Sequence, residues 1–189
     1  MKYGRPTRIL HALIAIGISL ELLLSLVMRT PKPGRVLTPL QSFGYEAHQM
    51  VGLAVLVVLF LHWLVFVTGH AHQGIGHFFP WFSKARMHAV SSDIRELLAL
   101  KVGDPEQRDS FSGAIEGLGF VVGSILAASG AVLFFGIAEN GVMSEAVHAV
   151  KEFHEFWGPV MWGYLGVHAA ATMVHLGLGH RSILAIFRC

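Results

Sequence analysis

Five of the twelve histidines in this chain occupy positions where a polar ring has to be explained. They are His11, His48, His62, His154 and His168, and each lies within or beside a long apolar run. A neutral imidazole nitrogen is a common metal ligand and serves as the axial ligand of many haem irons. Inside a membrane, a histidine is costly unless it has a partner, and such residues often mark functional sites. The five histidines therefore predict coordination chemistry within a bilayer.

The spacing of these histidines predicts two binding levels. His48 and His62 are fourteen residues apart, and so are His154 and His168. Fourteen residues of α-helix rise about 21 Å and return to within about 40° of the starting direction. His154 and His168 would then share one helix face at two depths, where each can meet a histidine of another helix. A flat, apolar haem fits between helices at such a pair, so we expect two bis-histidine haem sites.

One level has a clear pair and the other leaves two choices. His48 and His154 both reach the first level. Three histidines reach the second, and the spacing allows His168 to pair with either His11 or His62. Interhelical hydrogen bonds or a proton path are alternative roles for a membrane histidine, but four histidines at two matched depths favour haem ligation.

Small residues near the expected ligands could provide room for a haem edge. Gly52 lies one turn after His48, and Gly158 lies one turn after His154. Membrane helices are rich in glycine for another reason, because small residues let helices pack closely. Close packing better explains a second group of glycines, which is Gly113, Gly117, Gly119 and Gly123.

Four long apolar runs can position the histidines. They cover approximately residues 9–28, 47–68, 112–137 and 157–178. A helix needs about 20 mostly apolar residues to cross the hydrocarbon core. Overall, 53% of residues are hydrophobic and 14% are charged, whereas a soluble domain has about 25% charged residues. We therefore expect an all-α integral membrane protein, a four-helix bundle that forms a single domain over residues 1–189.

The distribution of basic residues predicts the orientation of this bundle. With the N-terminus inside, the outer loops hold four of the fourteen lysines and arginines: Arg29, Lys32, Arg35 and Lys151. The remaining ten lie on the inner side, as the positive-inside rule requires for an N-in, C-in protein. The His48–His154 level is then near the outer surface and the His168 level near the inner surface. A net charge of +2 is too small to indicate a nucleic-acid partner.

The longest connection, residues 69–111, would lie on the inner side. Within it, Ile94, Leu97 and Leu98 repeat at helical spacing after a serine-rich start, which predicts a short amphipathic helix over residues 91–100. The same connection contains aromatic residues of the kind that favour the membrane interface. These are Phe78, Phe79, Trp81 and Phe82.

The remaining reactive side chains give weaker signals. Cys189 is the only cysteine and the chain contains no CxxCH motif, so a haem would be held by coordination and packing alone. His70, His72 and His77 form a histidine-rich run that could bind a metal, although an interfacial loop is the favoured interpretation.

Two further polar residues lie on the helices that carry the expected ligands. Glu21 is about three turns beyond His11 and could either relay protons or make a structural hydrogen bond. His175 is two turns beyond His168 and could contact an inner haem propionate or a quinone.

Three segments resemble the bacterial cytochrome b561 superfamily, which includes the cytochrome b (gamma) subunits of formate dehydrogenase and of nickel–iron hydrogenase. The stretch from His154 to Ala171 is similar to the last helix of the family. Arg8 to Leu13 and Glu46 to Gly52 are similar to its first two ligand motifs. The resemblance covers all four apolar runs, and its specificity lies in the order of ligands along them: one, one, none and two.

The resemblance implies two haem b groups, with His48 and His154 holding the outer one and His11 and His168 the inner one. His62 is then spare, although it remains an alternative inner ligand. The family also implies electron transfer between a redox partner at the outer face, such as an iron–sulfur subunit, and membrane quinone. This would make the chain a multi-pass protein of the bacterial cytoplasmic membrane, and a respiratory electron-transfer subunit rather than a complete enzyme.

Within the superfamily, the long inner connection and the histidine-free third run are more similar to the formate dehydrogenase and hydrogenase subunits than to stand-alone members. One segment departs from that pattern. Where formate dehydrogenase subunits have an Asn-x-x-Gln-Lys-like segment near their quinone pocket, this chain has residues 111–116, Phe-Ser-Gly-Ala-Ile-Glu. Quinone contacts therefore cannot be carried over by identity.

Two other functions remain open. A stand-alone enzyme with the same fold could oxidise a small donor such as superoxide at the outer haem and reduce quinone. The outer basic residues would favour an anionic donor. A haem-free membrane scaffold or transporter is the third possibility, and a visible spectrum without a reduced b-type band would indicate it.

Overall fold

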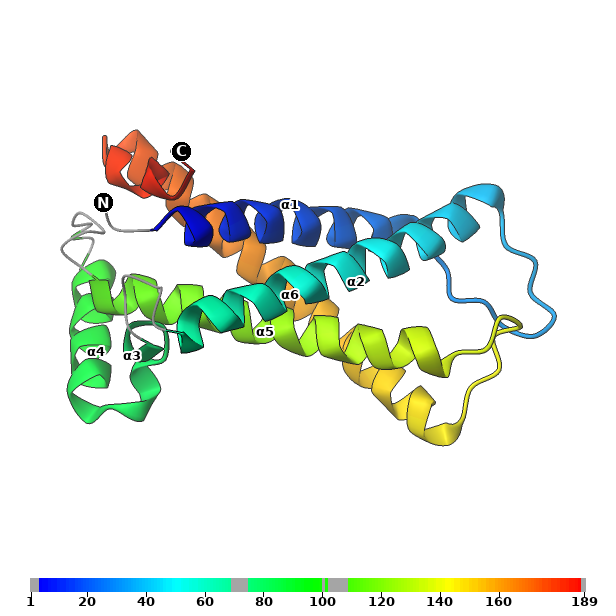
Figure 1. Cartoon of the computed structure of the whole chain (residues 1–189). Helices are drawn as coiled ribbons and strands as arrows, with labels where there is room; N and C mark the ends of the chain where they lie inside the picture. Colours follow the sequence, from blue (N-terminus) through cyan, green and yellow to red (C-terminus); the bar gives the residue numbers. More distant parts are fainter. Residues whose placement is uncertain (1–3, 69–74, 100, 102–108, 188–189) are drawn as a thin grey trace. The chain divides into compact units, whose positions relative to one another are not determined.

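The computed structural model describes residues 4–68, 75–99, 101 and 109–187. All regular structure in these residues is helical, as expected (Figure 1). The elements are α1 (Arg5–Val27), α2 (Pro39–Val67), α3 (Ile75–Phe78), the 3-10 helix η1 (Pro80–Phe82), α4 (Lys84–Leu98), α5 (Asp109–Gly136), α6 (Glu145–Gly177) and the 3-10 helix η2 (Arg181–Phe187).

Three of the described helices are long and apolar enough to cross a membrane. They span Arg5–Val27, Pro39–Val67 and Ser110–Gly136. The predicted crossings at residues 9–28 and 112–137 coincide closely with two of them, and the crossing at 47–68 overlaps the third, which begins earlier, at Pro39. The chain is thus an all-α membrane protein with three candidate spans.

The fourth predicted crossing, residues 157–178, lies in the 33-residue helix α6. This helix is long enough to span a bilayer but is not among the three that are sufficiently apolar. Its histidines, aromatic rings with polar groups and Pro159 lower its mean hydropathy relative to the aliphatic α2. The fourth crossing and the N-in, C-in orientation therefore stay predictions.

Helix α2 begins at Pro39, earlier than residue 47, because Thr38 and Gln41 cap it reciprocally. The Thr38 backbone N–H donates to Gln41 Oε1 at 3.1 Å, and the Gln41 backbone N–H donates to Thr38 Oγ1 at 3.3 Å. This is a capping box, with proline at the first helical position where its missing N–H costs nothing. The extension places His48 well inside a helix rather than at its start.

The predicted amphipathic helix is present as α4, but it begins at Lys84 rather than residue 91. Its Val90 is buried, while Ile94 and Leu97 remain partly exposed. The Asp93 carboxylate accepts the Phe111 backbone N–H at 3.2 Å. A carboxylate at a helix N-terminus is favourable, so this contact ties α4 to the first turn of α5.

The described chain divides into two compact units. The first comprises Met1–Ile9, His62–Val121 and Gly163–Cys189, and the second comprises Leu10–Leu61 and Val122–Trp162. The boundaries fall inside long helices, so this division does not test the prediction of a single domain. The candidate site described below lies wholly in the second unit.

In the first unit, an aromatic core joins the end of α2 to α3 and α5. Phe66 packs against Phe78 and Phe120, with ring centroids 4.6 and 5.2 Å apart. Trp63 stacks on Phe79 at 5.8 Å. Phe78 and Phe79 are therefore core residues.

The four aromatic residues that were expected at the membrane interface differ in burial. Phe78 and Phe79 are each only 6% exposed, whereas Phe82 is 86% exposed and Trp81 is partly exposed. Aromatic composition alone could not separate the two pairs, because burial depends on the chain folding back onto α5.

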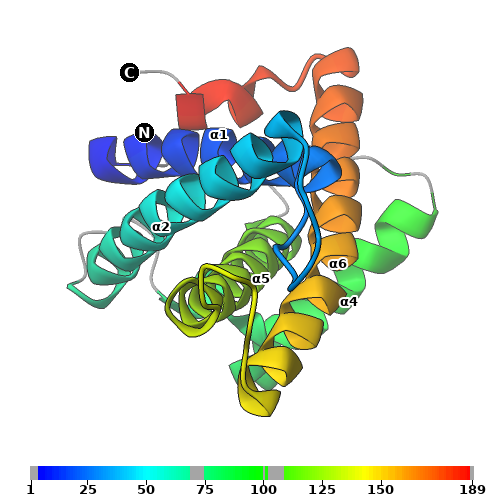
Figure 2. The same ribbon diagram turned by 90° about the vertical axis from the view of Figure 1, so that its right-hand side faces the viewer.

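In the second unit, the loop between α1 and α2 meets the loop between α5 and α6 (Figure 1, Figure 2). Gly141 has a φ of +80° and lies against the Pro31 carbonyl, where a Cβ would overlap the backbone. This close approach joins the ends of the helices that carry the expected outer ligands.

Gly117 of α5 packs closely against the Phe78 backbone in the first unit, and a substitution can test this contact. A Cβ there would overlap the carbonyl oxygen of Phe78, and backbone cannot move aside as a flexible side chain can. Gly117→Ala is therefore expected to cost about 1–3 kcal/mol of stability, as overpacking does, and to lower the thermal unfolding temperature in detergent. Gly177→Ala is the control, because open space surrounds Gly177 and alanine favours helix. Equal unfolding temperatures for the two variants would contradict the close packing.

Candidate haem site

His48 of α2 and His154 of α6, the predicted outer pair, lie opposite one another in the second unit. Their ring centroids are 6.2 Å apart and the ring planes are perpendicular. His48 and His154 each lie about two and a half turns after the start of their helix. At the start of α6, the Ser144 hydroxyl accepts the Val147 N–H at 3.3 Å. The sequence therefore predicted a pair that the structure brings together.

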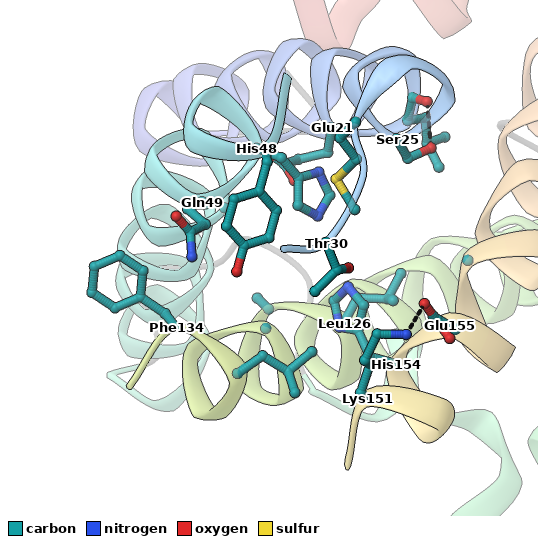
Figure 3. A pocket seen from close by; sticks show the side chains of 18 of the residues that line it. Glu21, Ser25, Thr30, His48, Gln49, Leu126, Phe134, Lys151, His154 and Glu155 are labelled. Atoms are coloured by element: carbon teal, nitrogen blue, oxygen red, sulfur yellow. Dashed lines mark hydrogen bonds and ion pairs between the residues drawn. The ribbon is translucent and has the colours of Figure 1, made fainter. Parts of the chain in front are cut away.

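A cavity of about 540 Å³ contains both rings. Figure 3 shows His48 and His154 on different walls of this cavity, with Glu21 next to His48. Cofactor sites typically have volumes of about 300–1,000 Å³ and mostly apolar walls with a few polar groups. The apolar side chains here come from α1, α2, α5 and α6 and include Leu22, Val55, Leu126, Met161 and Trp162.

The His154 ring is held by Ser129 of α5. The Ser129 hydroxyl lies 2.7 Å from the Ile125 carbonyl, to which it donates, and 2.9 Å from His154 Nδ1. Because the hydroxyl proton is directed to the carbonyl, the hydroxyl oxygen accepts from His154 Nδ1–H. This assigns the tautomer by the hydrogen-bond network and leaves Nε2 of His154 as the nitrogen available for coordination.

The His48 ring has a charged partner. Its Nδ1 lies 2.6 Å from Glu21 Oε2, and the His48 and Glu21 side chains are 19% and 15% exposed. A carboxylate beside Nδ1 favours the tautomer that carries its proton on Nδ1, which leaves Nε2 of His48 as the nitrogen available for coordination. Sequence reasoning gave Glu21 a structural hydrogen bond as one of two roles but did not identify its partner. It missed Ser129, whose only signal was a hydroxyl in an apolar run.

The separation of the two rings is compatible with a metal held between them. A metal–imidazole bond is about 2 Å long and the ring centre lies roughly 1 Å behind the bonding nitrogen, so two axial ligands place their ring centres about 6 Å apart. The measured separation is 6.2 Å. Gly158 lines the cavity with open space around it, and a Cβ at Gly52 would lie 3.6 Å from the nearest Glu21 oxygen. Both glycines thus leave room beside the ligands.

Basic residues also line this cavity. They are the four that we expect in the outer loops: Arg29, Lys32, Arg35 and Lys151. Lys151 forms an ion pair with Glu155 on the next turn of α6. The arginines and Lys32 are exposed, which gives the entrance of the cavity a positive potential suited to anionic groups.

The three inner histidines lie in different surroundings. His11 is on α1 in the second unit, whereas His62 and His168 belong to the first. The His168 ring stacks on Tyr164 at 5.6 Å. His62 is 6% exposed and packs against Phe66 and Phe120. The choice of His168's partner stays a prediction.

The other histidine predictions have mixed outcomes. His175 Nδ1 lies 3.0 Å from His180 Nδ1, a contact the sequence did not indicate. His70, His72 and Cys189 lie outside the described residues. His77 is described, and its ring packs edge-on against Phe78. In the part of the chain that the structure covers, no group of three or more metal-binding side chains is gathered.

Comparison with known proteins identifies the family of this chain. The sequence profile of prokaryotic cytochrome b561 matches residues 2–188, nearly the whole chain. Searches of the curated proteins and of the solved structures returned no significant match. The chain therefore belongs to the prokaryotic cytochrome b561 family, whose members carry electrons across membranes through b-type haem.

Proposed function

We propose that this protein transfers electrons across the bacterial cytoplasmic membrane through two b-type haems, between a redox partner at the outer face and membrane quinone. The observation that carries the proposal is the His48–His154 pair, which lines one cavity with Glu21 beside Nδ1 of His48 and Ser129 beside Nδ1 of His154. Nitrogen ligands prepared in this way are typical of metal sites in which surrounding groups fix the ligand rings.

The chain contributes ligation, orientation and exclusion of water. His48 and His154 would hold the outer haem, while Ser129 and Glu21 keep the two rings in one tautomer. A bound haem supplies the one-electron couple of its iron, and the protein sets its position and potential. The apolar wall keeps bulk water from the ligands.

For the inner haem we propose His11 and His168. The family resemblance favours this pair, and so does the environment of His62. The His62 ring has Phe66 and Phe120 at 4.7 and 5.1 Å, so it is already enclosed by aromatic neighbours of its own unit. His62 then serves as a buried side chain of the aromatic core rather than as a ligand.

The proposal has two forms, which differ in the electron donor. The family resemblance favours a respiratory subunit, similar to the gamma subunits of formate dehydrogenase and hydrogenase, that receives electrons from an iron–sulfur protein. The basic lining of the outer cavity favours a second candidate, a stand-alone enzyme that oxidises a small anion such as superoxide. Both forms use the same haem ligands and the same quinone step.

Spectroscopy of the purified chain tests the proposal. We expect a sharp reduced b-type α-band, two haems per chain by the pyridine haemochrome assay, and haem reoxidation on addition of a soluble quinone analogue under nitrogen. Haem reduction by superoxide without any partner would identify the stand-alone enzyme, and copurification with an iron–sulfur protein would identify the subunit. A chain without haem would refute the proposal and indicate a scaffold or transporter.

A further inference from the structure

We infer that Glu21 is a positioning residue that orients His48 and lowers the reduction potential of the haem held by His48 and His154. This inference rests on the proposed function. It goes further because it assigns a redox-tuning role to a carboxylate that coordinates nothing itself.

The contact between Glu21 and His48 is short and sheltered. Glu21 Oε2 lies 2.6 Å from His48 Nδ1, and both side chains are less than one-fifth exposed. The other oxygen, Oε1, is buried and has no hydrogen-bond partner in the described structure. Oε2 is therefore the carboxylate atom that contacts the His48 ring.

The two outer ligands differ in what holds them. Nδ1 of His154 lies against the neutral hydroxyl of Ser129, whereas Nδ1 of His48 lies 2.6 Å from a carboxylate oxygen. The carboxylate beside Nδ1 orients the His48 ring and makes its Nε2 a stronger electron donor, as in carboxylate–histidine–metal arrangements.

The negative charge of Glu21 would also shift the equilibrium between the oxidised and the reduced haem. The oxidised haem carries one more positive charge than the reduced haem. A carboxylate held against one axial ligand, in a poorly solvated cavity, stabilises the oxidised state more than the reduced state. Reduction is then less favourable, and the midpoint potential falls.

Glu21→Gln is the direct test, because glutamine keeps an oxygen that can accept Nδ1–H but removes the charge. In a redox titration of the holoprotein, we expect one haem to shift to a higher midpoint potential and the other to stay unchanged. The low-spin ferric EPR signal of the shifted haem should change as well. Glu152→Gln is the matched control, since Glu152 is exposed on α6, outside the cavity lining, and solvent screens its charge.

A second pair of variants leaves Glu21 in place. A Cβ at residue 52 would lie 3.6 Å from the nearest Glu21 oxygen. The hydroxyl of Gly52→Ser can therefore donate to the carboxylate and weaken its bond to His48, whereas Gly52→Ala adds similar bulk without a donor. We expect a higher potential in Gly52→Ser than in Gly52→Ala, and this pair decides the question if Glu21→Gln does not load haem.

The outcomes separate the inference from the proposed function. Two haems with unchanged potentials in Glu21→Gln would overturn the role of Glu21 and leave the electron-transfer function intact. So would an equal shift in Glu152→Gln, or equal potentials in the two Gly52 variants if Glu21→Gln lacks haem. A wild-type chain with no titrating haem would instead refute the proposed function.

Discussion

Replacing His48 or His154 with alanine is expected to remove one haem and leave the other bound. The two rings lie 6.2 Å apart on one cavity, and each supplies one of the two nitrogens that the site offers. The chain has no CxxCH motif, so no covalent bond would retain a haem that lost an axial ligand. The haem count per chain should therefore fall from two to one in either variant.

The measurement is a pyridine haemochrome count normalised to protein, together with the reduced-minus-oxidised spectrum. His148→Ala is the matched control, because His148 is an exposed histidine of the same helix, paired with Glu152 on the outer side. Loss of a bound cofactor also lowers the unfolding temperature, since ligand binding stabilises the folded state. A count of two after either ligand substitution would exclude His48 and His154 as the outer pair.

Replacing His11 with alanine is expected to remove the other haem, whereas replacing His62 with phenylalanine is expected to retain both. His62 is buried with an Nδ1 atom that has no hydrogen-bond partner in the described structure. An apolar ring of similar shape removes that unsatisfied group and keeps the contacts with Phe66 and Phe120, so stability should not fall. A combined His11→Ala and His154→Ala variant should bind no haem.

Haem counts and unfolding temperatures of these variants decide the inner ligand. Loss of one haem in His62→Phe with two retained in His11→Ala would reverse the assignment and pair His62 with His168. Potentiometric titration adds an independent check, because the haem that remains in His11→Ala should titrate like the one that is absent from His48→Ala.

The helices were predictable to different degrees. Aliphatic runs of about twenty residues identify membrane helices because the bilayer demands that length, and three candidate spans agree with the runs. The start of α2 was misplaced because hydropathy does not register caps, although the Thr38–Gln41 capping box was visible in the sequence. In α6, four histidines, several aromatic residues and Pro159 reduce the mean hydropathy, and some of them, such as His154 and Trp162, line the cavity.

The sequence by itself determined which residue types could bind haem and at which helical spacing, because a helix repeats its faces at a fixed rise and turn. It therefore predicted His48 and His154 as one pair. Only the tertiary structure showed the 6.2 Å separation and assigned Glu21 and Ser129 to the two rings. These partners come from α1 and α5, and contacts between helices depend on how the helices pack rather than on spacing along any one of them.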